Sequence, residues 1–386
     1  MAVPAVLTAT LLVPVPHTWT LGQLCWRLGF QLNELPVLAA VWVLAATTLA
    51  VAQGDLGNPV GLIAVAGAVL TLAGLAVVLW RGLQAGPIVA RALSDGLGSG
   101  WRVESAPELT ARLTRRRPWA RLLFAPFAVR RRDVIRRADL AYGPAGRANL
   151  LDVYRPRSGA VTGPCLVYFH GGGYRSGRKN REARALIYRL ASQGWLCVSA
   201  NYQLTRNAPY PAPLVDAKRV IAWMREHAPS YGADPSSIVV AGSSAGAHLA
   251  AMTALTPNAA ALQPGFEQAD THVSAAVCLY GFYGSPSWID REPGAPSAPI
   301  EHVDGDAPPM LIAHGTHDSF VNVSAARDFV ERFRNTAPKR PLVYLELPGA
   351  QHTFDLYRSV RFHAVIDAVD AFTASVHSSE PSSPAH

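Results

Sequence analysis

The segment SIVVAGSSAGAHLAA, residues 237–251, changes its pattern abruptly. An apolar run with β-branched residues ends at a cluster of glycine, serine and alanine, and a helix-like apolar pattern begins directly after the cluster. Residues 242–246 read Gly-Ser-Ser-Ala-Gly and match G-x-S-x-G between a strand and a helix. This spacing predicts Ser244 as a nucleophile on a sharp turn, with Ser243 at the variable position. For the segment alone, a serine that caps the helix is the alternative interpretation.

Strand-like and helix-like runs alternate from about residue 134 to residue 372. Six apolar runs predict strands, at 165–170, 195–200, 237–241, 273–280, 310–315 and 342–347. Helical patterns lie between or after them, at 181–193, 214–227, 247–255, 324–335 and 356–372. Several strand runs are apolar throughout, which is typical of a parallel sheet covered on both faces. The alternation therefore predicts a mostly parallel, doubly wound α/β domain, whose functional groups gather at the carboxyl ends of the strands.

The glycine-rich loop after the first predicted strand supplies a second part of the site. Residues 170–173 read His-Gly-Gly-Gly, and the missing side chains let backbone N–H groups approach an oxyanion. We predict the N–H groups of Gly171 and Gly172 as donors, together with that of Ala245, which directly follows the nucleophile. A phosphate cradle is the alternative, but the loop contains neither G-x-G-x-x-G nor the ending of a P-loop.

An acid and a base follow along the chain. Asp318 lies just past the fifth predicted strand, where a carboxylate can orient a histidine. His352 lies in the loop after the sixth, and we predict that it accepts the proton of Ser244 Oγ and returns it to the leaving group. The neighbouring His317 cannot readily turn back onto Asp318. Two further histidines are predicted to be structural, namely His248 and His314.

At these residues the chain resembles the α/β-hydrolase superfamily, and within it the hormone-sensitive-lipase-like esterases. The matching pieces are HGGGY at 170–174, SANYQL at 199–204, YPAPLVDA at 210–217, GADPSSIVVAGSSAG at 232–246, HGTHDSFV at 314–321 and GAQHTF at 349–354. The resemblance covers residues 134–372. It implies an α/β-hydrolase fold that hydrolyses carboxylic esters without a metal or an organic cofactor.

The chain departs from the pattern of this family in two places. Many such esterases have Asp where this chain has Ser243. Their acid often lies in a D-x-L-x-D stretch, whereas HGTHDSFV is more similar to kynurenine formamidases and to bacterial feruloyl-esterase-like enzymes. An arylformamidase or another small-amide hydrolase on the same triad is therefore an alternative function. A catalytically silent membrane scaffold is a third hypothesis, against which the intact triad argues.

Residues 1–81 predict a membrane region. Two uncharged apolar runs, of 17 residues at 36–52 and 22 residues at 59–80, are each about long enough to cross a hydrocarbon core of ~30 Å. The link between them is short, so they predict a helical hairpin; two buried core helices are the alternative. No basic segment precedes the first apolar stretch, which disfavours a secretory signal. Residues 3–16 are also apolar but contain three prolines, and we expect them at the membrane interface.

The net charge of +8 is concentrated after the second apolar run. From Arg81 to Arg137 there are 13 arginines, no lysine and four acidic residues. Because this basic segment directly follows an apolar one, we predict the lipid bilayer as a partner and not nucleic acid. By the positive-inside tendency, the catalytic domain faces the cytoplasm of a multi-pass cell-membrane protein. The hairpin with its Arg-rich connector resembles an arrangement in some actinobacterial membrane esterases.

The remaining segments complete the predicted domain plan. Residues 82–133 predict a basic amphipathic connector, which either lies on lipid headgroups or caps the next domain. The Ser- and Pro-rich tail at 373–386 is expected to be disordered. The four cysteines show neither CxxC pairing nor metal-ligand spacing, which predicts free thiols and no metal site. We expect a small-molecule or lipid-like ester as substrate.

Overall fold

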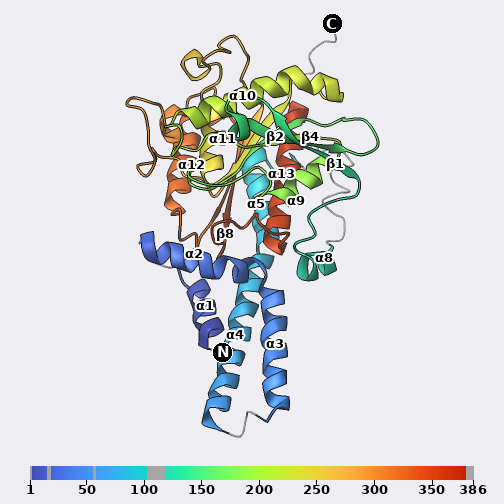
Figure 1. Cartoon of the computed structure of the whole chain (residues 1–386), viewed down its shortest axis with the longest axis vertical. Coiled ribbons are helices and arrows are strands. Elements are labelled where there is room, and N and C mark those ends of the chain that lie inside the picture. Colours follow the sequence, from blue (N-terminus) through green and yellow to red (C-terminus); the bar gives the residue numbers. More distant parts are fainter. Residues whose placement is uncertain (1, 15–18, 55–57, 102–117, 380–386) are drawn as a thin grey trace.

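The computed structural model describes residues 2–14, 19–54, 58–101 and 118–379 (Figure 1). Within these ranges an eight-stranded sheet has the order β1-β2-β4-β3-β5-β6-β7-β8. Strands β3 to β8 are parallel, whereas β1 and β2 run antiparallel to their neighbours. The strands are β1 (Val134–Ala141), β2 (Leu150–Pro156), β3 (Cys165–Phe169), β4 (Leu196–Ala200), β5 (Ile238–Ser243), β6 (Ala275–Leu279), β7 (Met310–Gly315) and β8 (Leu342–Leu347).

The six predicted strands all form, and the antiparallel pair β1–β2 is an addition at one edge of the sheet. Both added strands carry charged residues, as in the sequence VIRRADLA of β1, so they lack the continuous apolar runs of the central strands. An edge position explains the composition of β1, because one of its sides is not covered by another strand. In β2 the charged Asp152 is buried and forms ion pairs with Arg136 and Lys179.

Helices cover both faces of the sheet and bury two apolar layers. One layer contains residues of α10 (Ala212–His227), α11 (Ala245–Leu255) and α12 (Ser324–Thr336). The opposite layer contains residues of α5 (Ala85–Leu97), α9 (Arg184–Ala191) and α13 (Val360–Ser379). Alternate strand residues enter opposite layers, so Val167 and Phe169 face the first while Leu166 and Tyr168 face the second. Short 3₁₀ turns lie at η2 (Gly146–Asn149), η3 (Ala228–Tyr231), η4 (Ala260–Leu262) and η5 (Pro299–His302).

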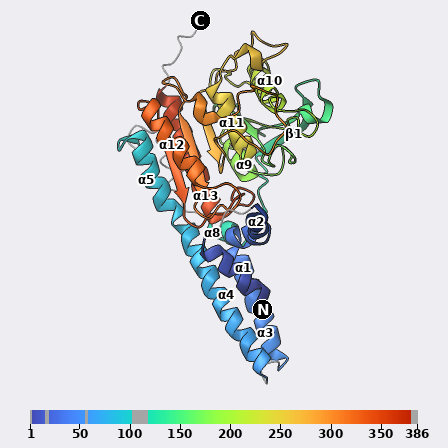
Figure 2. The same cartoon turned by 90° about the vertical axis from the view of Figure 1, so that its left-hand side faces the viewer.

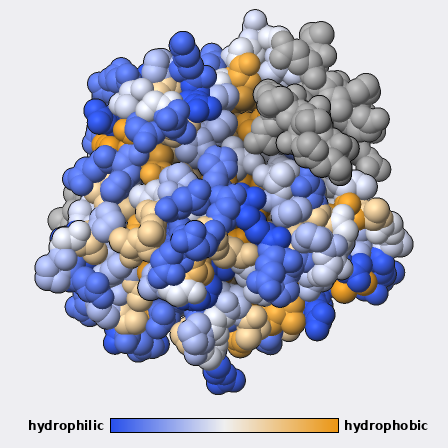
Figure 3. Space-filling model, turned by 90° about the horizontal axis from the view of Figure 1, so that it is seen from above, coloured by the Kyte–Doolittle hydropathy of each residue, from blue (hydrophilic) through white to orange (hydrophobic). Residues whose placement is uncertain are grey.

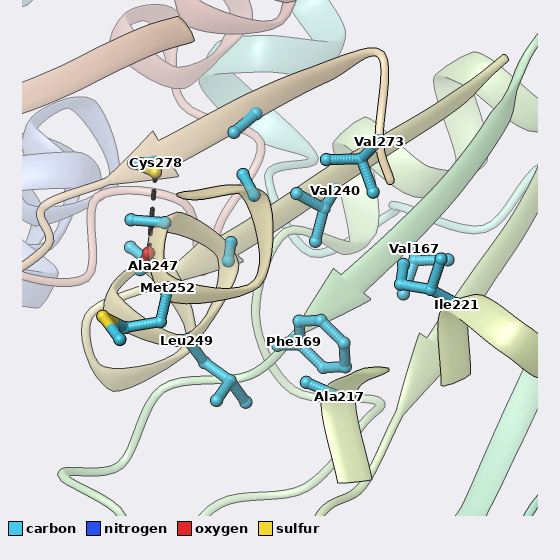
Figure 4. Packing of buried hydrophobic residues seen from close by; sticks show 14 of the residues in the cluster. Val167, Phe169, Ala217, Ile221, Val240, Ala247, Leu249, Met252, Val273 and Cys278 are labelled. Carbon is cyan, nitrogen blue, oxygen red and sulfur yellow. Dashed lines mark hydrogen bonds between the residues drawn. The ribbon is translucent and has the colours of Figure 1, made fainter. Parts of the chain in front are cut away.

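The first layer holds α11, the helix that follows Ser244 (Figure 4). Leu249 of α11 is fully buried, as are Phe169 and Val240 of the neighbouring strands. Cys278 of β6 lies 3.5 Å from the carbonyl oxygen of Ala247, which ties α11 to the sheet (Figure 4). Burying one such Leu or Phe side chain stabilises the fold by roughly 1.5–3 kcal/mol. This packing gives the turn before α11 a rigid base.

The N-terminal helices α1 (Ala2–Leu12), α2 (Trp19–Glu34), α3 (Pro36–Ala52) and α4 (Pro59–Leu83) lie below the sheet in Figures 1 and 2. Helices α3 and α4 pack side by side as a hairpin that extends away from the α/β domain (Figure 1). Both begin with proline, and Asn58 caps α4 by accepting a hydrogen bond from the N–H of Gly61 at 2.9 Å. The hairpin thus has the local start signals of two separate helices.

One continuous helix, from Pro59 to Leu97, is long and apolar enough to cross a membrane. The pair 22–34 and 36–52 meets the same criterion only when it is taken together, and it is bent by 89°. Among the described residues, every large exposed apolar side chain belongs to residues 6–127. By contrast, the face of the molecule opposite the hairpin is mostly hydrophilic (Figure 3).

Two segments differ from the sequence-based expectations. Residues 85–97 of the predicted connector form α5, whose residues Val89 and Leu93 are buried in the second layer, against the sheet. The predicted tail is wrong in its first part, because α13 continues to Ser379, and Thr373 and Val376 are buried. Residues 102–117 of the connector and the end of the tail, residues 380–386, lie outside the described residues. The short helix α8 (Trp119–Phe124) follows the first of these gaps.

Candidate active site

The turn between β5 and α11 carries Ser244 in a strained conformation. Ser244 has φ 56° and ψ −119°, a backbone conformation that residues other than glycine rarely adopt. Glycines make the turn possible, since a Cβ at Gly246 would overlap the carbonyl oxygen of Phe169 and one at Gly242 would overlap that of Gly246. Ser244 occupies the N-cap position of α11, but its side chain makes no capping hydrogen bond. The capping alternative is therefore wrong, and the hydroxyl is left for another partner.

That partner is His352. Its Nε2 lies 2.9 Å from Ser244 Oγ, and its Nδ1 lies 2.7 Å from Asp318 Oδ2. The three side chains are at least 92 % buried, although they come from segments far apart in the sequence. The structure thus brings the predicted nucleophile, base and acid into one continuous chain of hydrogen bonds.

Asp318 is held in its ionised form by its neighbours. One carboxylate oxygen accepts hydrogen bonds from the N–H groups of Phe320 and Val321, at 2.9 and 2.8 Å. Burial alone would raise the pKa of Asp318, but His352 and His314 outweigh it and hold the pKa well below its usual range. An ionised carboxylate fixes His352 with Nδ1–H toward the acid, which leaves Nε2 as an acceptor facing the serine.

Aromatic rings enclose the imidazole of His352. Tyr280 lies edge-on with its ring centroid 4.5 Å away, and Phe320 stacks at 5.1 Å. The indole of Trp26, from α2, lies 6.5 Å away and contacts Phe320 at 5.6 Å. The sequence did not reveal that an N-terminal helix contributes to the surroundings of the base, because no local pattern links residue 26 to residue 352.

The glycine-rich loop lies beside the nucleophile, as its motif predicts. A Cβ at Gly171 would lie 3.1 Å from the Cβ of Ser244. Gly172 has φ 125°, a backbone conformation that residues with a side chain rarely adopt. Gly173 lines the pocket next to Ser244 together with Ala245, so it is a candidate oxyanion donor that the sequence analysis omitted. The roles of Gly171, Gly172 and Ala245 as donors stay predictions.

The pocket at Ser244 is small and mostly apolar, with several aromatic side chains in its wall. Its free space is about 20 Å³, which is room for about one water molecule. The lining residues are Gly173, Tyr174, Ser244, Ala245, His248, Phe282, Pro286, Trp288, Phe320 and Val321. Such walls suit the hydrocarbon part of a substrate, and a larger acyl group requires the aromatic side chains to move apart.

A second buried carboxyl group, Asp355, lies under the nucleophile turn. The hydroxyl of Ser243 donates to Asp355 Oδ2 at 2.5 Å, and the hydroxyl of Tyr280 donates to Oδ1. Tyr168 in turn donates to Ser243 Oγ at 2.8 Å. Burial raises the pKa of Asp355 to about 7, nearby Glu182 adds to the rise, and the hydroxyl donors oppose it. The residue at the variable position of G-x-S-x-G is thus tied to the segment that carries His352.

The other histidines have structural partners. His248 is sandwiched between the hydroxyl of Tyr174 at 2.7 Å and the carbonyl oxygen of Ser297 at 2.8 Å. His314 Nε2 lies 3.0 Å from the carbonyl oxygen of Val321 and 3.3 Å from Asp318 Oδ2, so this histidine contacts the carboxylate that His352 also contacts. His317 turns away from the site and contacts the carbonyl oxygen of Leu11 at 3.0 Å.

Comparison with known proteins finds ester hydrolases that are similar to this chain. A family model described as BD-FAE matches residues 151–288. The chain is 34% identical to the probable carboxylic ester hydrolase LipM of Mycobacterium tuberculosis, over 98% of this chain and 93% of that protein. It is 37% identical to the esterase LipQ of the same organism, over 77% of this chain and 76% of the relative.

A solved structure of similar fold is the thermophilic esterase Est2 from Thermogutta terrifontis with bound butyrate. The TM-score is 0.55 at 25% identity, and the match covers 64% of this chain and 96% of the Est2 chain. The part of this chain without a counterpart therefore amounts to about a third, whereas the match to LipM includes nearly all of it.

Proposed function

Since the chain belongs to the α/β-hydrolase family of carboxylic ester hydrolases, we propose that it is a membrane-anchored serine esterase with Ser244, His352 and Asp318 as its catalytic triad. The observation that carries the proposal is the continuous contact from Asp318 through His352 to Ser244 Oγ, at 2.7 and 2.9 Å. The position of the serine on a strained strand-to-helix turn supports the same assignment.

In the acylation step, Ser244 Oγ attacks the carbonyl carbon of the ester while His352 Nε2 takes the hydroxyl proton. The negative charge moves to the carbonyl oxygen, which the N–H groups of Gly171, Gly172 and Ala245 stabilise. One such donor contributes about 3 kcal/mol to the transition state. The C–O bond then breaks, His352 gives its proton to the departing alcohol, and an acyl-enzyme remains.

In the deacylation step, a water molecule replaces the alcohol. His352 takes a proton from the water as its oxygen attacks the acyl carbon, and returns the proton to Ser244 when the acid leaves. Asp318 stays ionised throughout and stabilises the imidazolium that forms in both steps. These steps use only groups of this chain and water.

The test of the nucleophile is covalent labelling with a fluorophosphonate, together with turnover of p-nitrophenyl esters. We expect Ser244→Ala to abolish labelling and to lower kcat about a thousandfold or more, because the serine and histidine act as a unit. Ser243→Ala is the matched control, since it removes the neighbouring hydroxyl and leaves Ser244; it should still be labelled. Labelling of Ser244→Ala but not of Ser243→Ala would contradict the assignment.

The same protein distinguishes the alternative functions. An arylformamidase would show a higher kcat/KM for N-formylkynurenine than for short acyl esters, whereas an esterase shows the reverse. A silent scaffold would fold but would react with neither substrate nor with the fluorophosphonate. The similarity to the probable carboxylic ester hydrolase LipM and the esterase LipQ supports the esterase.

The hairpin of α3 and α4 is the proposed membrane anchor. At 25 residues α4 is about 37 Å long, more than a hydrocarbon core of ~30 Å requires. Large side chains on the hairpin are left in contact with solvent, among them Trp42, Val60, Ile63 and Leu70, each at least 61% exposed. Surface of this kind and extent is typical of a membrane-embedded region. The arginines after α4 support a cytoplasmic position of the catalytic domain.

A further inference from the structure

The loops that carry the acid and the base are both attached to the N-terminal helix α2. The hydroxyl of Ser319, next to Asp318, donates to the carbonyl oxygen of Gly22 at 2.9 Å. The indole N–H of Trp26 donates to Thr353 Oγ1, next to His352, at 3.1 Å. One helix therefore holds the neighbours of two members of the proposed triad.

The same edge of the sheet is fixed to the base of the hairpin. Asn33, near the end of α2, donates to the carbonyl oxygen of Gly349 at 2.7 Å, in the loop that leads to His352. Glu34 forms a buried ion pair with Arg361 at the start of α13, and both side chains are at least 95% buried. The carboxyl ends of β7 and β8 thus point toward the proposed membrane anchor, and α2 lies between them and the hairpin (Figure 1).

Helix α2 has one face on the catalytic domain and another in solvent. Gly22 and Trp26 contact the catalytic domain, whereas Leu24 and Leu28 are 53% and 44% exposed. The two leucines are four residues apart, so they lie on the same side of the helix. The chain bends by 89° between α2 and α3, so when α3 crosses a bilayer α2 lies along its surface. An amphipathic helix in this position is suited to the headgroup region.

We propose that α2 is an interfacial helix that seats the mouth of the active site on the lipid leaflet, and that the enzyme hydrolyses esters dissolved in that leaflet. The occupant of the exposed face of α2 is the bilayer itself, because α2 leads directly into α3 and the hairpin of α3 and α4 carries large exposed apolar side chains. The inference rests on the proposed function and adds a substrate class to it. Its physical basis is that a water-insoluble ester reaches the aromatic pocket without passing through water.

The first measurement places a probe on α2 in the full-length protein. Leu24→Cys is labelled with the environment-sensitive dye NBD, since the four native cysteines are buried. The protein is reconstituted in vesicles of phosphatidylcholine and phosphatidylglycerol that contain a spin-labelled lipid. We expect blue-shifted NBD emission and quenching by the spin label. Gln268→Cys, an exposed position in the loop before β6, is the control that should show neither effect.

The second measurement compares two substrates in the same vesicles. The ratio of kcat/KM for a membrane-dissolved ester, 4-methylumbelliferyl oleate, to that for soluble 4-methylumbelliferyl acetate reports on delivery from the leaflet. We expect Leu24→Gln/Leu28→Gln to lower this ratio at least tenfold. Gln268→Glu/Asn335→Glu is the matched control. It changes one exposed residue in the loop before β6 and one in the last turn of α12, which precedes β8, and it should leave the ratio unchanged.

The outcomes separate the inference from the function on which it rests. The interfacial role of α2 is overturned if the NBD emission at residue 24 is no more blue-shifted or quenched than the emission at residue 268. An unchanged substrate ratio in the Leu24→Gln/Leu28→Gln variant also overturns it. A wild-type protein that hydrolyses neither ester overturns the proposed function instead. Hydrolysis of acetate by the α2 variant shows that the variant is folded.

Discussion

At the scale of single residues, Asp355 is a buried carboxyl group that contacts the residue beside Ser244. It lies in the segment after His352 and accepts a hydrogen bond from the hydroxyl of Ser243. The contact joins the nucleophile turn to the segment that carries the base, so it fixes their separation. Asp355 does not touch the reacting atoms, and its role is to position them.

The raised pKa of Asp355 predicts a pH-dependent stability. Its folded-state pKa of about 7 exceeds the usual value of about 3.9 in an unfolded chain, so the folded state favours the protonated form. This contribution is fully present below about pH 4 and is lost as the pH rises to about 7, with a size on the order of a few kcal/mol. We expect Asp355→Asn, which does not titrate, to show a smaller fall of melting temperature between pH 5 and pH 8 than the wild type.

The measurement is thermal unfolding in detergent, followed by intrinsic tryptophan fluorescence at several pH values. Asp306→Asn is the control, because the side chain of Asp306 is 98% exposed, and it should keep the wild-type slope. Parallel slopes for wild type and Asp355→Asn would show that Asp355 is not the group responsible.

At the scale of elements, α2 is the helix whose contacts are hardest to predict from its own sequence. Its sequence, WTLGQLCWRLGFQLNE, predicts only a moderately amphipathic helix. In the structure, its small residues permit close approach to the catalytic domain: a Cβ at Gly22 would overlap the carbonyl oxygen of Ser319. The helix is therefore fitted against the loop of the acid at backbone distance.

Gly22→Ala consequently tests the coupling of α2 to catalysis. The added methyl group pushes α2 away from the Asp318 loop, and we expect kcat for a soluble ester to fall about tenfold with a smaller change in KM, because acid placement affects the transition state more than binding. The matched control is Gly82→Ala in α4, where a Cβ would meet no atom within 4 Å. Its kcat should stay at the wild-type value; equal losses in both variants would point to a general effect of helix substitution.

At the scale of the whole molecule, exposed apolar side chains and hydrophilic surface lie at opposite ends. The exposed large apolar side chains of the described residues lie in the N-terminal third, and the face farthest from the hairpin is mostly hydrophilic (Figure 3). The basic segment follows the second hairpin helix directly. These features favour one orientation, with the hairpin in the membrane and the catalytic domain on the cytoplasmic side.

Single cysteines report this orientation in intact cells. Gln53→Cys lies at the far end of the hairpin and Glu331→Cys lies on α12, and both positions are exposed. We expect a membrane-impermeant maleimide to label position 53 from outside and position 331 only after lysis. The native cysteines are buried and give little background. Labelling of position 331 in intact cells would place the catalytic domain outside.

The sequence by itself determined the features that depend on neighbouring residues. The nucleophile turn, the six central strands and the starts of the hairpin helices follow from apolar periodicity, glycine and proline, whose effects extend over a few residues. The charged strand β1 was missed because it forms by backbone pairing with β2 and is mostly not buried. Strand β2 and the helical end of α13 were missed because tertiary burial outweighed local composition there.

Only the tertiary structure decided which distant segments meet. Asp355 contacts Ser243 across 112 residues, and Gly22 contacts Ser319 across 297. Helix α5 joins the sheet instead of remaining a connector, since its apolar side finds a larger surface to bury there. Such contacts depend on the packing of whole layers, which fixes separations that no local pattern records.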